Sequence, residues 1–171
     1  LVIAAGIAGA ACATIVTTFL ADRLGRRATL FFLAQLTALG ALPLIFNLHL
    51  ATPALMLLAF VGMLNGMGTD RSAAYALEQA IIPGLVPDDR RTWSLAWYSL
   101  ALDSSGALGA LAAGWPLLQQ RLHGIDLAAS YRSLFIGYAL VNSLSGFLCL
   151  LLSAEVEIVR AGSPPVWRIP V

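Results

Sequence analysis

The sequence predicts an all-α, polytopic transmembrane helix bundle, and three observations support this fold class. Of its 171 residues, 59% are hydrophobic and only 11% are charged, whereas about 25% of a soluble domain is charged. Apolar runs of the length that crosses about 30 Å of hydrocarbon recur along the chain. Arginines gather in alternate connections between these runs. Because backbone polar groups must be paired inside lipid, such runs fold as helices.

Five spans are expected in order, and a tail follows them. The first run already opens at Leu1, so we expect it to be cut within a helix. The tail, residues 154–171, is expected to be a cytoplasmic tail or a linker remnant, because its prolines interrupt a regular helix. The predicted spans are residues 1–20, 28–48, 54–76, 93–118 and 132–153.

The distribution of arginines predicts the orientation of these spans. One side of the membrane would carry Arg23, Arg26, Arg27, Arg90, Arg91, Arg160 and Arg168. The other side would carry only Arg121 and Arg132. Basic residues favour the cytoplasmic side, so the first connection, the third connection and the tail are expected there. We expect an integral membrane protein of a bacterial-type inner membrane or a plasma membrane.

The connection between the first two spans is a short basic turn, Leu20-Ala-Asp22-Arg23-Leu-Gly25-Arg26-Arg27. Gly25 permits a sharp turn with positive φ. Asp22 can pair with the neighbouring arginines or with a helix N-terminus. Two helices joined by so short a turn must be antiparallel neighbours.

This turn resembles the loop between the second and third helices of major facilitator transporters. Thr18 stands where the family pattern begins with glycine. The matching positions are Leu20, Ala21, Asp22, Arg23, Gly25, Arg26, Arg27 and Leu30.

The resemblance extends to later spans. The third span carries a GxxxG pair, Gly62 and Gly66, similar to the family's fourth helix, and GxxxG lets backbones approach closely. The fourth carries a small-residue stripe, Gly106, Ala110 and Gly114, similar to the fifth helix. Helices two to six fit best. A related motif between helices eight and nine leaves the C-terminal half open as an alternative.

The resemblance implies a secondary active transporter that moves a small solute by alternating access around a site near the bilayer midplane. The ion that we consider for coupling to solute transport is the proton. The expected partners are the lipid bilayer, a small-molecule solute and the missing remainder of the transporter. No nucleic acid, metal or cofactor is expected.

Charged residues inside the spans are functional candidates, because each costs about 2.5–3.5 kcal/mol at the membrane centre. Asp103 is expected near the midplane, and Asp70 and Arg71 in the cytoplasmic third. All three are candidates for substrate or ion coupling, although Asp70 and Arg71 could instead only hold helices together. Asp103 shares a helix face with the small-residue stripe, so we expect it to face the bundle or a wet cavity.

Glu78 is expected at the cytoplasmic boundary, on the helix face that also carries Arg71 and Tyr75. We predict that Asp22, Arg26 and Glu78 form a charge cluster at that membrane face. The complete predicted gate consists of Asp22, Arg23, Gly25, Arg26, Arg27 and Glu78.

Two alternatives to a transporter remain open. One is a non-transporting scaffold or a relative of a receptor. The other is an intramembrane aspartyl protease that uses Asp70 and Asp103, but Asp70 follows Gly68 one residue too late for that family's motif. Cys12 and Cys149 lie in apolar runs without redox or metal spacing. We therefore expect no enzyme.

Overall fold

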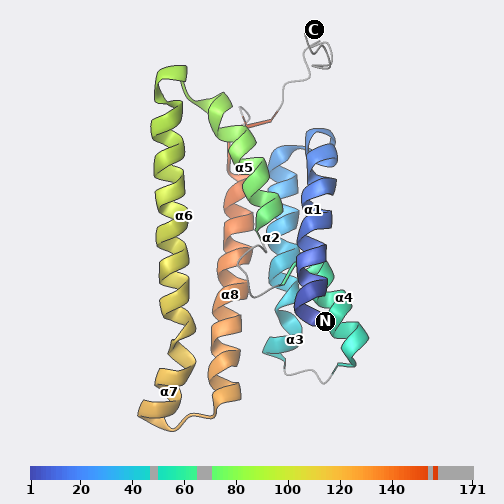
Figure 1. Cartoon of the computed structure of the whole chain (residues 1–171), viewed down its shortest axis with the longest axis vertical. Helices are drawn as coiled ribbons and strands as arrows, with labels where there is room; N and C mark the ends of the chain where they lie inside the picture. Colours follow the sequence, from blue (N-terminus) through green and yellow to red (C-terminus); the bar gives the residue numbers. More distant parts are fainter. Residues whose placement is uncertain (47–49, 65–70, 154–155, 158–171) are drawn as a thin grey trace.

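The computed structural model describes residues 1–46, 50–64, 71–153 and 156–157, apart from the side chains of Leu20 and Asp22 (Figure 1). The described residues form helices and connections without a strand, which confirms the all-α class. The elements are α1 (Val2–Leu24), α2 (Arg26–Gly40), α3 (Leu42–Ile45), α4 (Thr52–Val61), α5 (Ser72–Leu85), the 3₁₀ turn η1 (Asp88–Arg90), α6 (Arg91–Ala113), α7 (Trp115–His123) and α8 (Leu127–Leu150).

Three stretches of helix are long and apolar enough to cross a membrane: Val2–Phe19, Arg26–Ile45 and Leu127–Leu150. The expected third span is distributed over α4 and α5, and part of it lies outside the described residues. Helix α6 is 23 residues long, but Asp103 and several serines make it less apolar than these three. The number of five spans therefore stays a prediction.

Several helix ends differ from the predicted boundaries for local reasons. Helix α6 ends at Ala113 rather than 118, because Pro116 lacks an N–H and its ring collides with the preceding turn. Helix α8 begins before 132 because the carboxylate of Asp126 accepts the amides of Ala128 and Ala129, at 3.1 and 3.4 Å. Helix α5 continues past 76 to residue 85, because the good helix formers of residues 77–80 extend it, and it includes Pro83 in its last turn.

The core lies among α1, α2, α4 and α5, and glycines bring their backbones close. A Cβ on Gly9 of α1 would lie 1.9 Å from the carbonyl oxygen of Phe60 in α4. A Cβ on Gly62 would lie 2.7 Å from the Cα of Gly40 at the end of α2. The close approach expected of Gly62 therefore involves α2. Gly66 lies outside the described residues.

Helix α8 packs along α2 through a small polar and aromatic interface. The side-chain amide of Gln35 donates a hydrogen bond to the carbonyl of Ser143, and the hydroxyl of Ser143 donates one to the side-chain oxygen of Gln35, both at 3.1 Å. The rings of Phe31 and Phe147 meet edge to face with centroids 5.3 Å apart. This interface joins α8 to α2.

Helix α6 lies at the edge of the bundle (Figure 1), and none of its residues is buried. It contacts mainly α5, η1 and α7. A cleft of about 760 Å³ lies between the far half of α6 and α8, and its lining includes Gly109, Trp115, Phe135 and Tyr138. Helix α7 itself packs against α8. The bundle is therefore closely packed on one side and open on the other.

The connections alternate between the two ends of the bundle. Figure 1 places the α1–α2 turn, η1 and the end of α8 at one end, and α3 and α7 at the other. The arginines of the first and third connections thus share one end. The orientation of that end toward the cytoplasm stays a prediction.

Candidate functional site

The basic turn between α1 and α2 is built on Gly25. Its φ is +94°, which confirms the predicted use of glycine for positive φ. The Gly25 amide donates to the carbonyl of Ala21 at 3.0 Å, and the Thr29 hydroxyl donates to the carbonyl of Gly25 at 2.8 Å. A Cβ on Gly25 would lie 3.2 Å from the carboxylate oxygens of Glu157. Hydrogen bonds therefore fix the turn on both sides, and the Glu157 carboxylate covers Gly25 closely.

Helix α2 opens in an electrostatically unfavourable way. Its first two residues are Arg26 and Arg27, and Gly25 offers no side chain to cap the helix. Cations at a helix N-terminus oppose the helix dipole, and the first amides of the helix lack partners within it. An anion is needed at this position, and it comes from a distant part of the chain.

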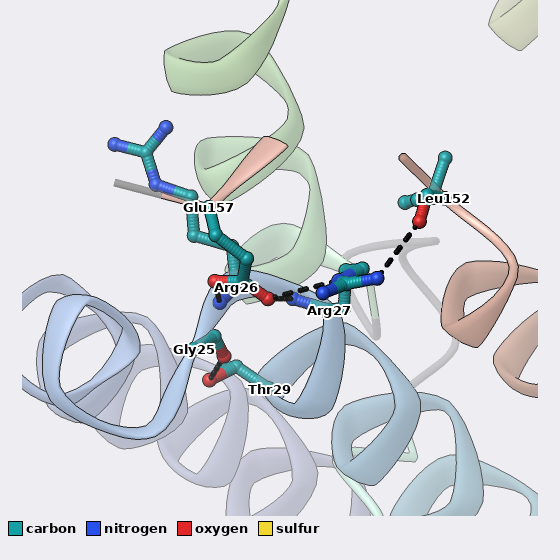
Figure 2. Close-up of polar contacts among 6 residues, drawn as sticks. All are labelled: Gly25, Arg26, Arg27, Thr29, Leu152 and Glu157. Carbon is teal, nitrogen blue, oxygen red and sulfur yellow. Dashed lines mark hydrogen bonds and ion pairs between the residues drawn. The ribbon is translucent and has the colours of Figure 1, made fainter. Parts of the chain in front are cut away.

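Glu157, which follows α8, supplies that anion (Figure 2). Its carboxylate accepts the amide of Arg26 at 2.7 Å, the amide of Arg27 at 3.1 Å and the Arg27 guanidinium at 3.2 Å. The same guanidinium donates to the carbonyl of Leu152 at 3.0 Å. We call Glu157 with Arg26 and Arg27 the Glu157 clasp, since it fastens the end of α8 to the start of α2.

The clasp holds Glu157 in its ionised form. Its side chain is 27% exposed, and burial alone would raise the pKa. Hydrogen bonds from the amides of Arg26 and Arg27, and then the Arg27 guanidinium, outweigh that effect, so the pKa of Glu157 lies below its usual range. Sequence reasoning missed Glu157 as a site residue. The available signal was the uncapped, doubly basic start of α2, at the end where the last span also finishes.

Glu78 takes part in a second cluster, between α5 and α6. One carboxylate oxygen accepts the Arg71 guanidinium at 3.0 Å, so the predicted shared face of these two residues is present. The other oxygen accepts the hydroxyl of Tyr98 in α6. The Tyr98 ring stacks on Tyr75, with centroids 6.0 Å apart and planes at 22°. We call Arg71, Glu78 and Tyr98 the Glu78 bridge, in which Tyr98 is a further residue that sequence reasoning missed.

The predicted cluster of Asp22, Arg26 and Glu78 stays a prediction. The Asp22 side chain lies outside the described residues, and the described contacts of the Glu78 carboxylate are with Arg71 and Tyr98. Arg26 and α5 line a common cleft of about 150 Å³. Arg23 is exposed in the last turn of α1, where a cation complements the helix dipole.

The two remaining coupling candidates are Asp70 and Asp103. Asp70 lies outside the described residues. Asp103 is exposed on α6, and within the described part of the chain neither a hydrogen bond nor an ion pair engages its carboxylate. It is also absent from the lining of the α6–α8 cleft. That Asp103 faces the bundle or a wet cavity stays a prediction.

Together, these features define a polytopic membrane protein with a basic turn clasped at one end of its helix bundle. The sequence model of the Major Facilitator Superfamily matches residues 1–168, and the chain belongs to this family. Its members are membrane transporters rather than enzymes. No curated protein and no solved structure matches the chain. Across the described residues, no group of three His, Cys, Asp or Glu side chains could hold a metal ion.

Proposed function

We propose that the chain forms part of a secondary active transporter that moves a small solute by alternating access, with the Glu157 clasp as its cytoplasmic gate. The observation that carries the proposal is the bond between the basic turn and a carboxylate 130 residues away. In alternating access, parts of the bundle rock against one another around a central site. Contacts at a membrane face must then break and form again in each cycle.

The clasp is weak enough to break and form again in each transport cycle, as a gate must. Hydrogen bonds to charged groups contribute about 1.5–3 kcal/mol each when they are shielded from water. Glu157 and Arg27 are 27% and 33% exposed, so solvent weakens their ion pair toward the value of a surface pair, about 0–1 kcal/mol. The clasp can thus favour one conformation without locking the bundle in it.

The exposed side of α6 supports a role for the remainder of the transporter. A charged side chain facing lipid costs about 2.5–3.5 kcal/mol near the membrane centre, and Asp103 is exposed on α6. We propose that the remainder of the transporter covers this face and gives Asp103 a protein or water environment. Asp103, Asp70 and Arg71 remain the candidates for substrate or proton coupling, in a bacterial-type inner or plasma membrane.

The test is solute uptake by the full-length transporter in proteoliposomes, using the solute that a panel screen finds best transported. Glu157→Gln removes the charge but keeps the size. We expect the transport rate to change about tenfold, the effect of losing one charge-assisted bond, while the apparent affinity changes little. The matched control is Asp89→Asn at the same end of the bundle, which removes an exposed carboxylate of η1.

Two results would overturn the gate. One is an unchanged rate in Glu157→Gln, and the other is an equal change in Asp89→Asn. If the folded wild-type protein moves no solute of the panel, a non-transporting scaffold becomes the better description.

A further inference from the structure

We propose that Tyr98 is a positioning residue that tethers α6 to α5 through Glu78, and that α6 pivots about this tether when the transporter changes conformation. The inference rests on the proposed function for its role in transport. The tether itself is a property of the bundle and can be tested separately.

The side-chain bonds that join α6 to the preceding elements lie in its first two turns. Arg91 opens the helix, donating to the carbonyl of Pro83 at 3.0 Å and pairing with Asp88 at 2.7 Å. Tyr98 then donates its hydroxyl to Glu78. Within the described part of the chain, no side-chain hydrogen bond joins α6 to another helix beyond Tyr98. From Tyr98 to Ala113 the helix extends about 22 Å at 1.5 Å per residue.

Beyond Tyr98, α6 continues as one unbroken helix to Ala113, where the chain turns into α7. Apart from the half-buried Leu102 its residues are exposed, and the cleft of about 760 Å³ separates its far half from α8. Gly106 and Gly109 have no atom within 4 Å of an added Cβ. A small rotation at Tyr98 therefore displaces the far end of the helix most, and α7, which begins at Trp115 with Pro116 buried and packs against α8, must move with it.

Glu78 is well placed to release and recapture Tyr98. Arg71 holds the other carboxylate oxygen at 3.0 Å, so Glu78 keeps its charge partner when Tyr98 leaves. A cavity of about 20 Å³ lies beside Arg71 and Glu78, lined also by Asn142, Ser145 and Cys149. This volume fits about one water molecule, which can satisfy a carboxylate oxygen. Breaking the tether therefore leaves no buried charge without a partner.

The stacked tyrosines offer a matched pair of variants. The hydroxyl of Tyr98 bonds across to α5, whereas the hydroxyl of Tyr75 accepts a bond of 2.8 Å from Gln79 on its own helix. Phenylalanine at either position keeps the stacked rings. Comparison of Tyr98→Phe with Tyr75→Phe thus isolates the hydroxyl that joins the two helices.

The experiment measures the distance between α6 and α8 by electron–electron double resonance in lipid nanodiscs. Spin labels replace Leu108 and Leu140, which are 67% and 64% exposed, in the full-length protein with Cys12 and Cys149 changed to alanine. We expect Tyr98→Phe to raise the population of displaced α6 about tenfold, as the loss of a bond to a charged group predicts. Tyr75→Phe should keep the wild-type distribution.

A wild-type distribution in Tyr98→Phe would overturn the tether, and so would equal broadening in both variants. Transport assays on the same proteins test whether Tyr98 positions α6 for transport. Tyr98→Phe should change the turnover rate about tenfold with little change in apparent KM. Equal changes in both constants would overturn that role. Absence of transport in every variant, including wild type, would contradict the proposed function, while the distances would still decide the tether.

Discussion

The two sides of this bundle use small residues in opposite ways. On α1, Gly9 is buried and its backbone lies against the carbonyl of Phe60 in α4. On α6, Gly106 and Gly109 are exposed, with no neighbouring atom in reach of an added Cβ. The same residue type thus gives a completed helix contact in one place and an open face in the other. Small-residue stripes in a sequence therefore predict where helices can approach, but not which partner they meet.

The largest expected effect compares Gly9→Ala with Gly109→Ala. The new methyl at position 9 would collide with backbone 1.9 Å away, so α1 must shift from α4, and overpacking of this kind costs about 1–3 kcal/mol or more. At position 109 the methyl meets open space, and alanine should stabilise the helix by up to about 1 kcal/mol. Thermal unfolding in detergent measures both. Equal unfolding temperatures would remove the contrast between the two sides.

A smaller difference should separate two glycines with positive φ. Gly25 has φ +94° beneath Glu157, and Gly124 has φ +66° with no atom within 4 Å of an added Cβ. Alanine should cost about 1–2 kcal/mol of backbone strain at Gly124, whose φ of +66° and ψ of 17° are left-handed helical, and up to about 3 kcal/mol at Gly25, whose ψ of 137° is not. Only Gly25→Ala also disturbs the clasp. Its loss of unfolding free energy should therefore exceed that of Gly124→Ala, and the reverse order would contradict a closely covered turn.

The smallest expected effect concerns the dependence of stability on pH. The pKa of Glu157 is lower in the folded chain than in the unfolded chain, where a free glutamate titrates near about 4.3. Its contribution is therefore present above about pH 4.3 and is lost as the pH falls through the folded-state pKa. Glu157→Gln should reduce the acid-induced fall in unfolding temperature. An identical pH profile in both proteins would argue against an ionised clasp.

A feature of this structure can be predicted from the sequence when the residues that cause it lie close together in the chain. Membrane class and the Gly25 turn depend on local patterns, so both could be predicted. The end of α6 at Ala113 also has a local cause, Pro116. The apolar run continues past Pro116, so the sequence pattern alone does not indicate that the helix ends there. The Glu157 clasp depends on two segments 130 residues apart, which no local pattern brings together.

The contact of Tyr98 with Glu78 is a different case. Both residues lie near the connection between α5 and α6, and helical periodicity places Arg71 and Glu78 on one face of α5. Which face of α6 turns toward them depends on the angle between the two helices, which η1 sets. Periodicity alone does not specify that angle, so Tyr98 could not be identified from the sequence.

The Glu157 clasp also has a consequence for biosynthesis. Arg26 and Arg27 leave the ribosome long before Glu157 is made, because 130 residues separate Arg27 from Glu157. During that interval no carboxylate from residue 157 offsets their charge, and basic residues beside a span favour the cytoplasmic side during insertion. With the predicted cytoplasmic orientation of this turn, the same two arginines would serve first as a topological signal and later, once α8 is in place, as half of a tertiary contact.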